Sequence, residues 1–307
     1  MTTDTILSTA SEADSKARRG FVLALFAYLL WGLLPFYIKA VGHLPIVEVV
    51  AHRIIWSVPI AAGVLIFLGR TADFKRAIRS RKMIGMAALT AAIISINWSV
   101  YLWAIIVGRT VEGALGYYIN PLVNVVVGAL LLGEKLDRWQ MAAVALAAVA
   151  VSVLTYEVGV LPWISLALAF SFAAYGYFRK TLPIGPSQGF LLEVLILSVP
   201  ALGYVLWLAA TGQGHFATGN LEDTLLLVGC GPITAVPLLL FAFGARLLRF
   251  STIGIMQYIA PTMVFLIAVF VFHEPFGTVQ AIAFGLIWAA LLIYTWSMFA
   301  ASRRAVP

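Results

Sequence analysis

The residues from Tyr118 to Gln140 read YINPLVNVVVGALLLGEKLDRWQ, and a similar stretch from Tyr258 to Gln280 reads YIAPTMVFLIAVFVFHEPFGTVQ. The second copy repeats a Tyr, an Ile, a Pro, a Glu and a Gln at one constant offset of 140 positions. The polar and proline pairs are Pro121 with Pro261, Glu134 with Glu274, and Gln140 with Gln280. Apolar segments resemble one another by chance, but a shared Pro, Glu and Gln at one offset indicates an internal repeat.

The composition of the chain places it in a membrane. Of its 307 residues, 62% are hydrophobic and only 11% are charged, against roughly 25% charged in an ordinary soluble domain. The chain has too little polar surface to cover soluble cores, so most of its surface must face lipid. We therefore expect an all-α integral membrane protein.

Apolar runs of about 20 residues, the length that crosses a bilayer, predict ten transmembrane helices. They cover residues 21–40, 45–68, 83–106, 112–132, 139–157, 161–179, 188–210, 222–244, 251–272 and 278–299.

The basic residues predict the orientation. With the N-terminus in the cytoplasm, 17 of the 20 Lys and Arg residues fall on the cytoplasmic side, as the positive-inside rule requires. Both termini are therefore expected to be cytoplasmic. Residues 1–19 are polar and predict a disordered cytoplasmic tail. A signal peptide is the alternative, but the apolar run that follows is too long and no small-residue cleavage site follows it, so we expect an uncleaved first span.

The two copies of the repeated stretch lie in the fourth and fifth spans and in the ninth and tenth. Five spans separate each element from its counterpart, so the second copy crosses the membrane in the opposite sense. This predicts two inverted five-helix repeats, residues 20–157 and 158–299, with a cytoplasmic C-terminal tail at 300–307. Inverted repeats are typical of carriers, since two similar halves can exchange conformations around a central site.

Several other classes of site are not indicated. The net charge of +7 could suggest nucleic acid, but the basic residues lie between apolar blocks and not on one periodic face, so we expect no nucleic-acid partner. The single cysteine, Cys230, allows no intramolecular disulfide. The four histidines have no ligand spacing, so we expect no metal site and no cofactor.

The stretch LLLGEKLDRWQ, followed by an Ala-rich span, resembles the motif that ends each repeat in the EamA-type branch of the drug/metabolite transporter superfamily. The stretches RGFVLALFAYLLWGLLPFYIKAVGHLP and AHRIIWS resemble the RarD-type members more narrowly. The resemblance covers nearly the whole chain from Gly20. It departs at His273, where the family motif has Gly. It implies a ten-helix carrier in the plasma (inner) membrane, and many members of the family export metabolites or amino acids.

Arg53 lies about eight residues into the second span, or ~12 Å along the helix. A charge at that depth is costly and usually faces a cavity or a partner. We expect Arg53 either to pair with Glu193 of the seventh span or to bind a carboxylate of the solute, for which its planar fork is suited. The alternative is a structural ion pair that joins the two spans. Lys39 is expected to reach the outer interface.

The third and fourth spans are unusually polar and aromatic. Polar residues four apart share a helix face, and a polar amide facing lipid would be unsatisfied, so these faces are expected to point inward. Aromatic walls with a few amides fit a pocket for a small, partly apolar solute. The alternative is interhelical hydrogen bonding and interfacial anchoring. The candidate solute-binding residues, besides Arg53, are Asn97, Tyr101, Tyr117, Asn120, Asn124, Gln257 and Tyr258.

Glu134 and Glu274 each lie at the end of a span and are expected either to cap the next helix, where a carboxylate complements the helix dipole, or to hold Lys135, Arg138 or the backbone. A role in proton coupling is the alternative for them, and Glu193 is the one acid deep in a span. Prolines such as Pro121 and Pro261 are expected to kink or unwind their helices.

These features together favour a secondary carrier of small solutes, with no catalytic residues. There is no P-loop and no soluble domain that could hold a nucleotide. A membrane enzyme would need clustered acid–base or metal-binding residues, and a channel would need a ring of like groups. Neither pattern is present in the sequence. The expected partners are the solute and membrane lipids.

Overall fold

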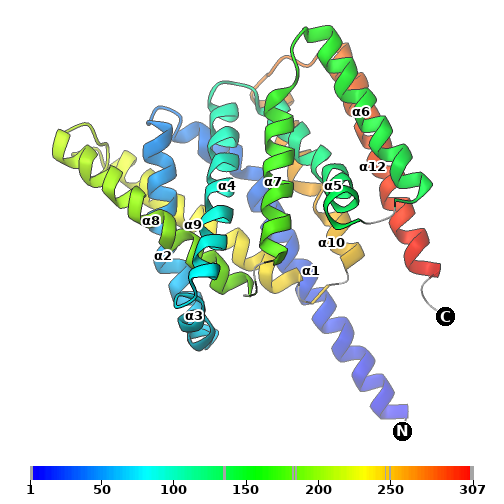
Figure 1. The fold of residues 1–307 in the computed structure, drawn as a ribbon, viewed down its shortest axis with the longest axis horizontal. Helices are drawn as coiled ribbons and strands as arrows, with labels where there is room; N and C mark the ends of the chain where they lie inside the picture. Colours follow the sequence, from blue (N-terminus) through cyan, green and yellow to red (C-terminus); the bar gives the residue numbers. More distant parts are fainter. Residues whose placement is uncertain are drawn as a thin grey trace.

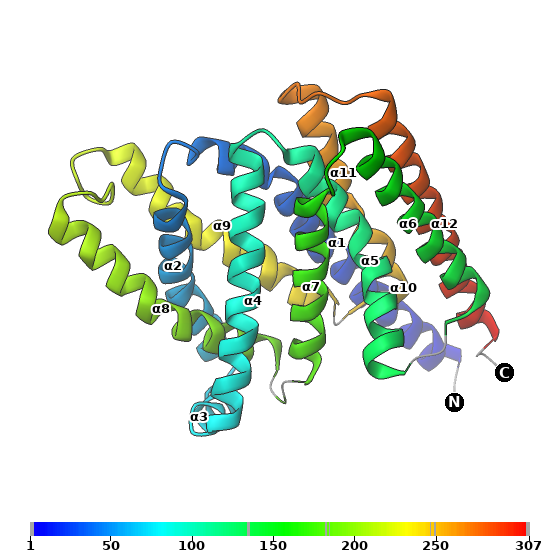
Figure 2. The same ribbon diagram turned by 45° about the horizontal axis from the view of Figure 1, so that its top comes forward.

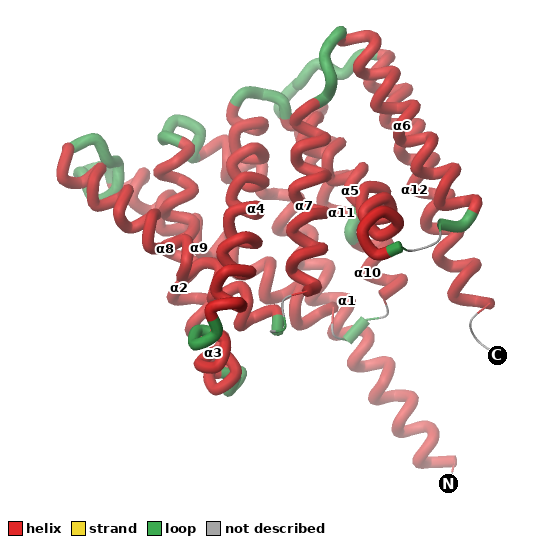
Figure 3. Tube along the Cα trace, viewed as in Figure 1, coloured by secondary structure: helices red, strands yellow, loops and turns green. Residues whose placement is uncertain are grey.

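The computed structural model describes residues 3–133, 136–181, 183, 185–245, 247–248 and 250–304. Within these residues all regular structure is helical, and short connections join the helices (Figure 3). Eight of the helices are long and apolar enough to cross a membrane. The described part of the chain is therefore a multi-pass, all-helical membrane protein, as the composition predicts.

The eight long apolar helices are α1 (Thr3–Ala40), α2 (Ile46–Phe67), α4 (Arg81–Ile106), α5 (Thr110–Leu132), α6 (Arg138–Val158), α8 (Pro186–Thr211), α9 (Leu221–Ala245) and α12 (Thr278–Arg304). A short helix, α3 (Thr71–Ala77), lies between α2 and α4. The sixth expected range is occupied by α7 (Trp163–Thr181), which has 19 residues and is not among the eight.

The expectation of a disordered N-terminal tail is wrong, because α1 already begins at Thr3. The tail is polar, but it contains Ala, Glu, Lys and Arg, which are favourable helix formers.

The ninth expected range is not one continuous helix. It consists of α10 (Phe250–Met256), α11 (Ile259–Leu266) and the π-helix η1 (Ile267–Val271). Pro261 lacks an amide hydrogen and its ring crowds the carbonyl four residues earlier, that of Gln257, where the helix breaks. Local unwinding therefore occurs at Pro261. At Pro121, its counterpart in the repeat, α5 continues as one helix.

Four helix pairs have the most extensive contacts: α6 with α12, α2 with α8, α5 with α7, and α1 with α9. Figure 1 shows α6 and α12 side by side at one edge of the molecule and α8 at the opposite edge. The start of α1, the end of α12 and α3 lie at one end of the bundle, and the α4–α5 and η1–α12 connections lie at the other (Figure 2). We call these the inner end and the outer end, following the orientation expected from the basic residues.

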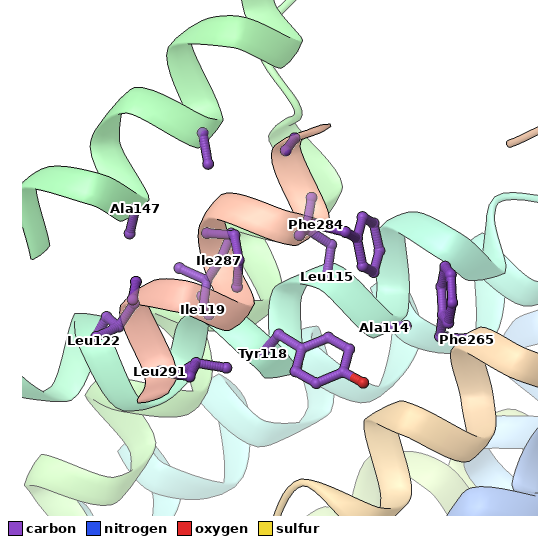
Figure 4. Close-up of a cluster of buried hydrophobic side chains, with 14 of the residues drawn as sticks. Ala114, Leu115, Tyr118, Ile119, Leu122, Ala147, Phe265, Phe284, Ile287 and Leu291 are labelled. Atoms are coloured by element: carbon purple, nitrogen blue, oxygen red, sulfur yellow. The ribbon is translucent and has the colours of Figure 1, made fainter. Parts of the chain in front are cut away.

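Two groups of buried side chains hold the bundle together. In the first, Tyr118 and Ile119 of α5 pack with Phe284 and Ile287 of α12 and with Phe265 of α11 (Figure 4). The second group surrounds the candidate site. It joins α1, α2, α4, α7 and α9 through residues that include Leu34, Ile38, Leu102, Ile105, Leu168 and Leu227.

Candidate functional site

Arg53, the eighth residue of α2, carries a positive charge inside the bundle. Its guanidinium carbon lies 4.4 Å from the ring centroid of Trp98 on α4, a cation–π contact. Its Nε atom is buried without a hydrogen-bond partner. Among the described residues, no carboxylate forms an ion pair with this side chain. An uncompensated charge at this depth is costly, so Arg53 keeps its capacity to bind an anion.

Tyrosines from three other helices surround Arg53. Tyr37 of α1, Tyr101 of α4 and Tyr117 of α5 are all close enough to interact electrostatically with its guanidinium. The rings of Tyr101 and Tyr117 meet edge to face, with centroids 5.3 Å apart. The Tyr37 hydroxyl donates a hydrogen bond to the Leu226 carbonyl. The charge therefore lies in an aromatic setting.

A small cavity lies beside this charge. Its volume is about 20 Å³, room for a single water molecule, and Leu34, Tyr37, Ile38, Arg53, Leu102 and Cys230 are among the residues that line it. The Tyr37 hydroxyl is 3.6 Å from the Cys230 sulfur across this space. An apolar lining with a few polar groups is typical of a small-molecule site.

Asn97 precedes Trp98 in α4, and its amide is already engaged. Its Nδ2 atom donates to the Leu168 carbonyl at 3.0 Å and to the Ser171 hydroxyl at 2.9 Å, both on α7. Its Oδ1 atom accepts a hydrogen bond from the Tyr117 hydroxyl at 3.3 Å. Asn97 thus joins α4, α5 and α7, which is the interhelical alternative that the sequence left open.

Glu193 does not pair with Arg53, so the pairing we expected is wrong. Glu193 lies 3.5 Å from Nε of Arg179 and accepts hydrogen bonds from Thr90 at 2.7 Å and Tyr175 at 3.2 Å. The reason is depth. The antiparallel pair α2 and α8 brings Ile54 against Ala201, and Ala61 against Val194.

This register places Arg53 and Glu193 about nine residues apart along the paired helices, or ~13 Å at 1.5 Å per residue. An ion pair needs a separation near 4 Å. Arg53 is therefore in the outer half of the bundle, and Glu193 is in the inner half.

The other predicted residues do not gather at Arg53. Asn120 is buried and its Oδ1 atom has no hydrogen-bond partner. Asn124, four residues further along α5, is exposed, so the expectation that it points inward is wrong. The residues of α5 become more exposed toward its inner end. The helix face that Asn120 and Asn124 share is therefore no longer covered by other helices at Asn124. Gln257 and Tyr258 lie at the α10–α11 break, and Tyr258 packs against the α5–α12 core.

Lys39 lies at the outer end of α1, where it was expected. Its Nζ atom is 5.3 Å from the ring centroid of Phe272 and 3.5 Å from the Ile106 carbonyl.

Two histidine–carboxylate pairs join the halves of the chain at the outer end. His43 lies 2.7 Å from Asp223, and this hydrogen bond raises the pKa of His43 above its ordinary value. His215 bonds to Glu48 through both its ring and its backbone amide, each at 2.8 Å. Hydrogen bonds from Ser297 and the backbone of α6 lower the pKa of Asp137 at the inner end.

The repeated glutamines occupy equivalent places in the structure. Gln140 accepts a hydrogen bond from the backbone amide of Asp137 at 3.1 Å, and Asp137 caps the first turn of α6 in return. Gln280 accepts from the amide of Gly277 at the start of α12. Each glutamine closes the N-terminus of its own helix, as in a capping box.

Glu274 caps a different helix from the one expected. Its two carboxylate oxygens accept hydrogen bonds from the backbone amides of Thr110 and Val111, each at 2.9 Å, in the first turn of α5. Glu274 therefore does not cap the following helix, and it takes the other expected role, holding the backbone, here that of a distant helix. Its counterpart Glu134 lies outside the described residues.

The residues that the sequence failed to single out at this site are Tyr37 and Cys230. Trp98 belongs to the aromatic third span that was expected to line a pocket, but its contact with Arg53 was not predicted. Tyr37 and Cys230 come from α1 and α9, and only the tertiary packing brings them to α2. In the described part of the chain, no group of three or more His, Cys, Asp or Glu residues is placed to hold a metal ion.

Comparison with known proteins identifies the family. Residues 18–156 match the model of the EamA-like transporter family. The chain is 42% identical to protein RarD of Streptomyces exfoliatus, with 96% of this chain and 93% of that protein covered. It is also 42% identical to the uncharacterized transporter YojE of Bacillus subtilis, with 92% and 95% covered.

A solved structure, titled only as the crystal structure of a protein, matches with a TM-score of 0.55 at 19% identity, and the match covers 96% of this chain and 99% of that one. At this identity it supports the fold alone. The chain belongs to the RarD-type members of the EamA-like transporter family, and it is a membrane transporter.

Proposed function

We propose that this transporter is a secondary active or facilitative carrier that exports small metabolites, such as amino acids or amphipathic drugs, across the plasma membrane. It works by alternating access, with both termini in the cytoplasm. Its ten transmembrane segments form two inverted five-helix repeats. Eight of these segments are the long apolar helices, and the other two are α7 and the broken helix α10–α11–η1. We assign it no catalytic step.

The helix contacts support the two-repeat arrangement. In this arrangement α5 corresponds to α10–α11, α7 to α1, and α4 to α9. The packing of α5 on α7 then has its counterpart in α11 on α1, and that of α1 on α9 in α7 on α4. The pairs α2–α8 and α6–α12 correspond to themselves. Two halves with equivalent contacts can exchange conformations at little cost, which is the physical basis of alternating access.

The observation that carries the proposal is the uncompensated charge of Arg53. A charge that only stabilised the fold would be expected to have a partner, as Glu193 has in Arg179. Arg53 instead faces tyrosines and a small apolar cavity. We therefore place the solute here, with a carboxylate or another anionic group on the guanidinium and an apolar part against the aromatic rings.

Counterflow in proteoliposomes tests this function. Vesicles are loaded with an unlabelled solute from a panel of amino acids and small metabolites, and uptake of the labelled counterpart is followed. We expect saturable uptake of at least one class of anionic or zwitterionic solute. Arg53→Ala should abolish it, while Arg138→Ala, which removes an exposed arginine at the start of α6, should not. Equal uptake by wild-type protein and Arg53→Ala would contradict the proposed site.

A further inference from the structure

We propose that Glu274 is a conformational latch, whose carboxylate holds the outer end of the bundle closed by capping α5 and whose release opens the path to the Arg53 site. The proposal rests on the alternating access proposed above. It adds the contact that distinguishes the closed outer end from the open one.

The latch is a bond between the two repeats. Glu274 belongs to the connection between η1 and α12, and it caps a helix whose first residue is 164 positions earlier in the chain. Each carboxylate oxygen takes one backbone amide hydrogen that α5 cannot use itself. The negative charge also lies at the positive end of the α5 dipole. The side chain is buried at 8% exposure, so these bonds are shielded from water.

The backbone that presents Glu274 is strained. His273, immediately before it, has φ +54°, a left-handed conformation that non-glycine residues adopt only at a cost. The π-helix η1 precedes it, and the Glu274 amide reaches back to the Ala268 carbonyl at 2.9 Å. Strained backbone and π-helical turns are concentrated at functional sites, where a segment must adopt one shape in one state.

The same connection packs, through Phe272, against the group of buried side chains that surrounds the candidate site. The Phe272 ring meets Phe36 of α1 edge to face, with centroids 5.7 Å apart. The Lys39 Nζ atom also lies over the Phe272 ring, 5.3 Å from its centroid. Tyr37, the neighbour of Phe36, lines the cavity. On the other helix that the latch holds, Tyr117 lies about two turns below Thr110 and beside Arg53. A solute that reached Arg53 from the outer side would have to separate Phe272 and Glu274 from α1 and α5.

The burial of α5 agrees with a bundle closed at this end. Its latched half is mostly buried, with Thr110 at 0%, Tyr118 at 2% and Leu122 at 2% exposure. Its inner half includes the exposed residues Asn124, Leu130 and Leu131. The structure thus presents the outer end tightly packed, which is the state that the latch stabilises.

The native cysteine provides a direct test, because Cys230 is the only cysteine of the chain and lines the cavity beside Arg53. It is 2% exposed. Wild-type protein and Glu274→Gln are placed in right-side-out membrane vesicles, and the rate of labelling by a membrane-impermeant maleimide is measured without solute. Cys230→Ser gives the background. Glu222→Gln is the matched control, since Glu222 is an exposed glutamate in the first turn of α9 at the same end.

We expect Glu274→Gln to be labelled on the order of tenfold faster than wild type, the effect of losing one charge-assisted hydrogen bond. Glu222→Gln should be labelled at the wild-type rate. Equal rates for wild type and folded Glu274→Gln, or an equal acceleration in both variants, would overturn the latch. Glu274→Asp keeps the charge but shortens the side chain, so it should give an intermediate rate if Glu274→Gln does not fold, and an unchanged rate would count against the proposal.

This experiment also separates the latch from the proposed function. Labelling reports the conformation of the outer end and requires no transported solute. A chain that fails the counterflow test but shows faster labelling in Glu274→Gln would keep the latch and lose the carrier assignment. The opposite pair of results would keep the carrier and lose the latch.

Discussion

Gly133 and His273, which lie 140 positions apart, adopt the same left-handed backbone conformation, with φ of +66° and +54°. Gly133 follows α5, and His273 comes after η1. Each residue directly precedes a repeated glutamate in the sequence. The repeat therefore extends to the backbone at this position, although the two residues differ. Glycine adopts this conformation freely, whereas histidine does so at a cost.

His273→Gly should therefore be tolerated, and His273→Val should not. Glycine removes the strain of the left-handed conformation, while a β-branched residue raises it, and we expect His273→Val to lower the free energy of unfolding by about 1–2 kcal/mol. Thermal unfolding of the purified protein in detergent measures the difference. If His273→Val and His273→Gly unfold at the same temperature, the left-handed conformation at this position carries no strain.

The effect of replacing a helix glycine by alanine should depend on the space around that glycine. A Cβ atom at Gly116 would lie 2.8 Å from the Ser165 carbonyl and 3.0 Å from Leu168, where α5 meets α7. A Cβ atom at Gly203 of α8 would meet nothing within 4 Å. We expect Gly116→Ala to destabilise the protein by about 1–3 kcal/mol through overpacking, and Gly203→Ala to be neutral or slightly stabilising. The measurement is unfolding in detergent, and equal effects would mean that α5 and α7 do not approach so closely.

Much of this architecture could be predicted from the sequence because lipid imposes simple rules. Hydrophobic length predicts the helices, and the ends of α2, α5, α9 and most others fall within a few residues of the expected ranges. The repeated Gln140 and Gln280 act locally, within one turn of their own helices, so their capping role follows from spacing. Arg53 could be singled out because a charge at such depth is rare.

What could not be predicted depends on contacts between distant segments. Glu274 was expected to cap the next helix or to hold the backbone, but nothing in the sequence points to the backbone of Thr110, which is 164 positions away. The predicted pairing of Arg53 with Glu193 is wrong because each residue is the eighth of its own helix. Since α2 and α8 are antiparallel, their first residues lie at opposite ends of the bundle.

The pair of Glu193 and Arg179 should behave as a coupled, buried ion pair. Their side chains are 3% and 17% exposed. Glu193→Gln or Arg179→Gln alone leaves a charge without its partner, and each should lower stability by about 3 kcal/mol. The double variant should lose much less than the sum of the two, because no charge is then left unpaired. A double-mutant cycle by chemical or thermal unfolding measures this coupling, and additive losses would show that the two charges do not interact.

The pair of His43 and Asp223 should make the outer end sensitive to pH. The hydrogen bond to Asp223 raises the pKa of His43, and the nearby Glu222 acts in the same direction. The histidine is therefore more easily protonated in the folded protein. The stabilisation it gives is fully present below the ordinary histidine pKa of about 6.5 and is lost as pH rises through the raised value. Between these limits the unfolding temperature should decrease with pH.

His43→Gln should remove this part of the pH dependence, since glutamine carries no titrating group. Unfolding temperatures of wild type and variant are compared from below to above pH 6.5, with His215 present in both. Parallel curves for the two proteins would show that the His43–Asp223 pair does not contribute.

If Arg53 binds the anionic group of the solute, the transporter should prefer a carboxylate to its neutral amide. Once counterflow has identified an exchanged acid, the KM of that acid is compared with the KM of its amide, in wild-type protein and in Arg53→Gln. A guanidinium–carboxylate contact predicts that wild type favours the acid by on the order of tenfold or more, and that Arg53→Gln loses this preference while remaining folded. An undiminished preference for the acid in Arg53→Gln would show that Arg53 does not bind the carboxylate.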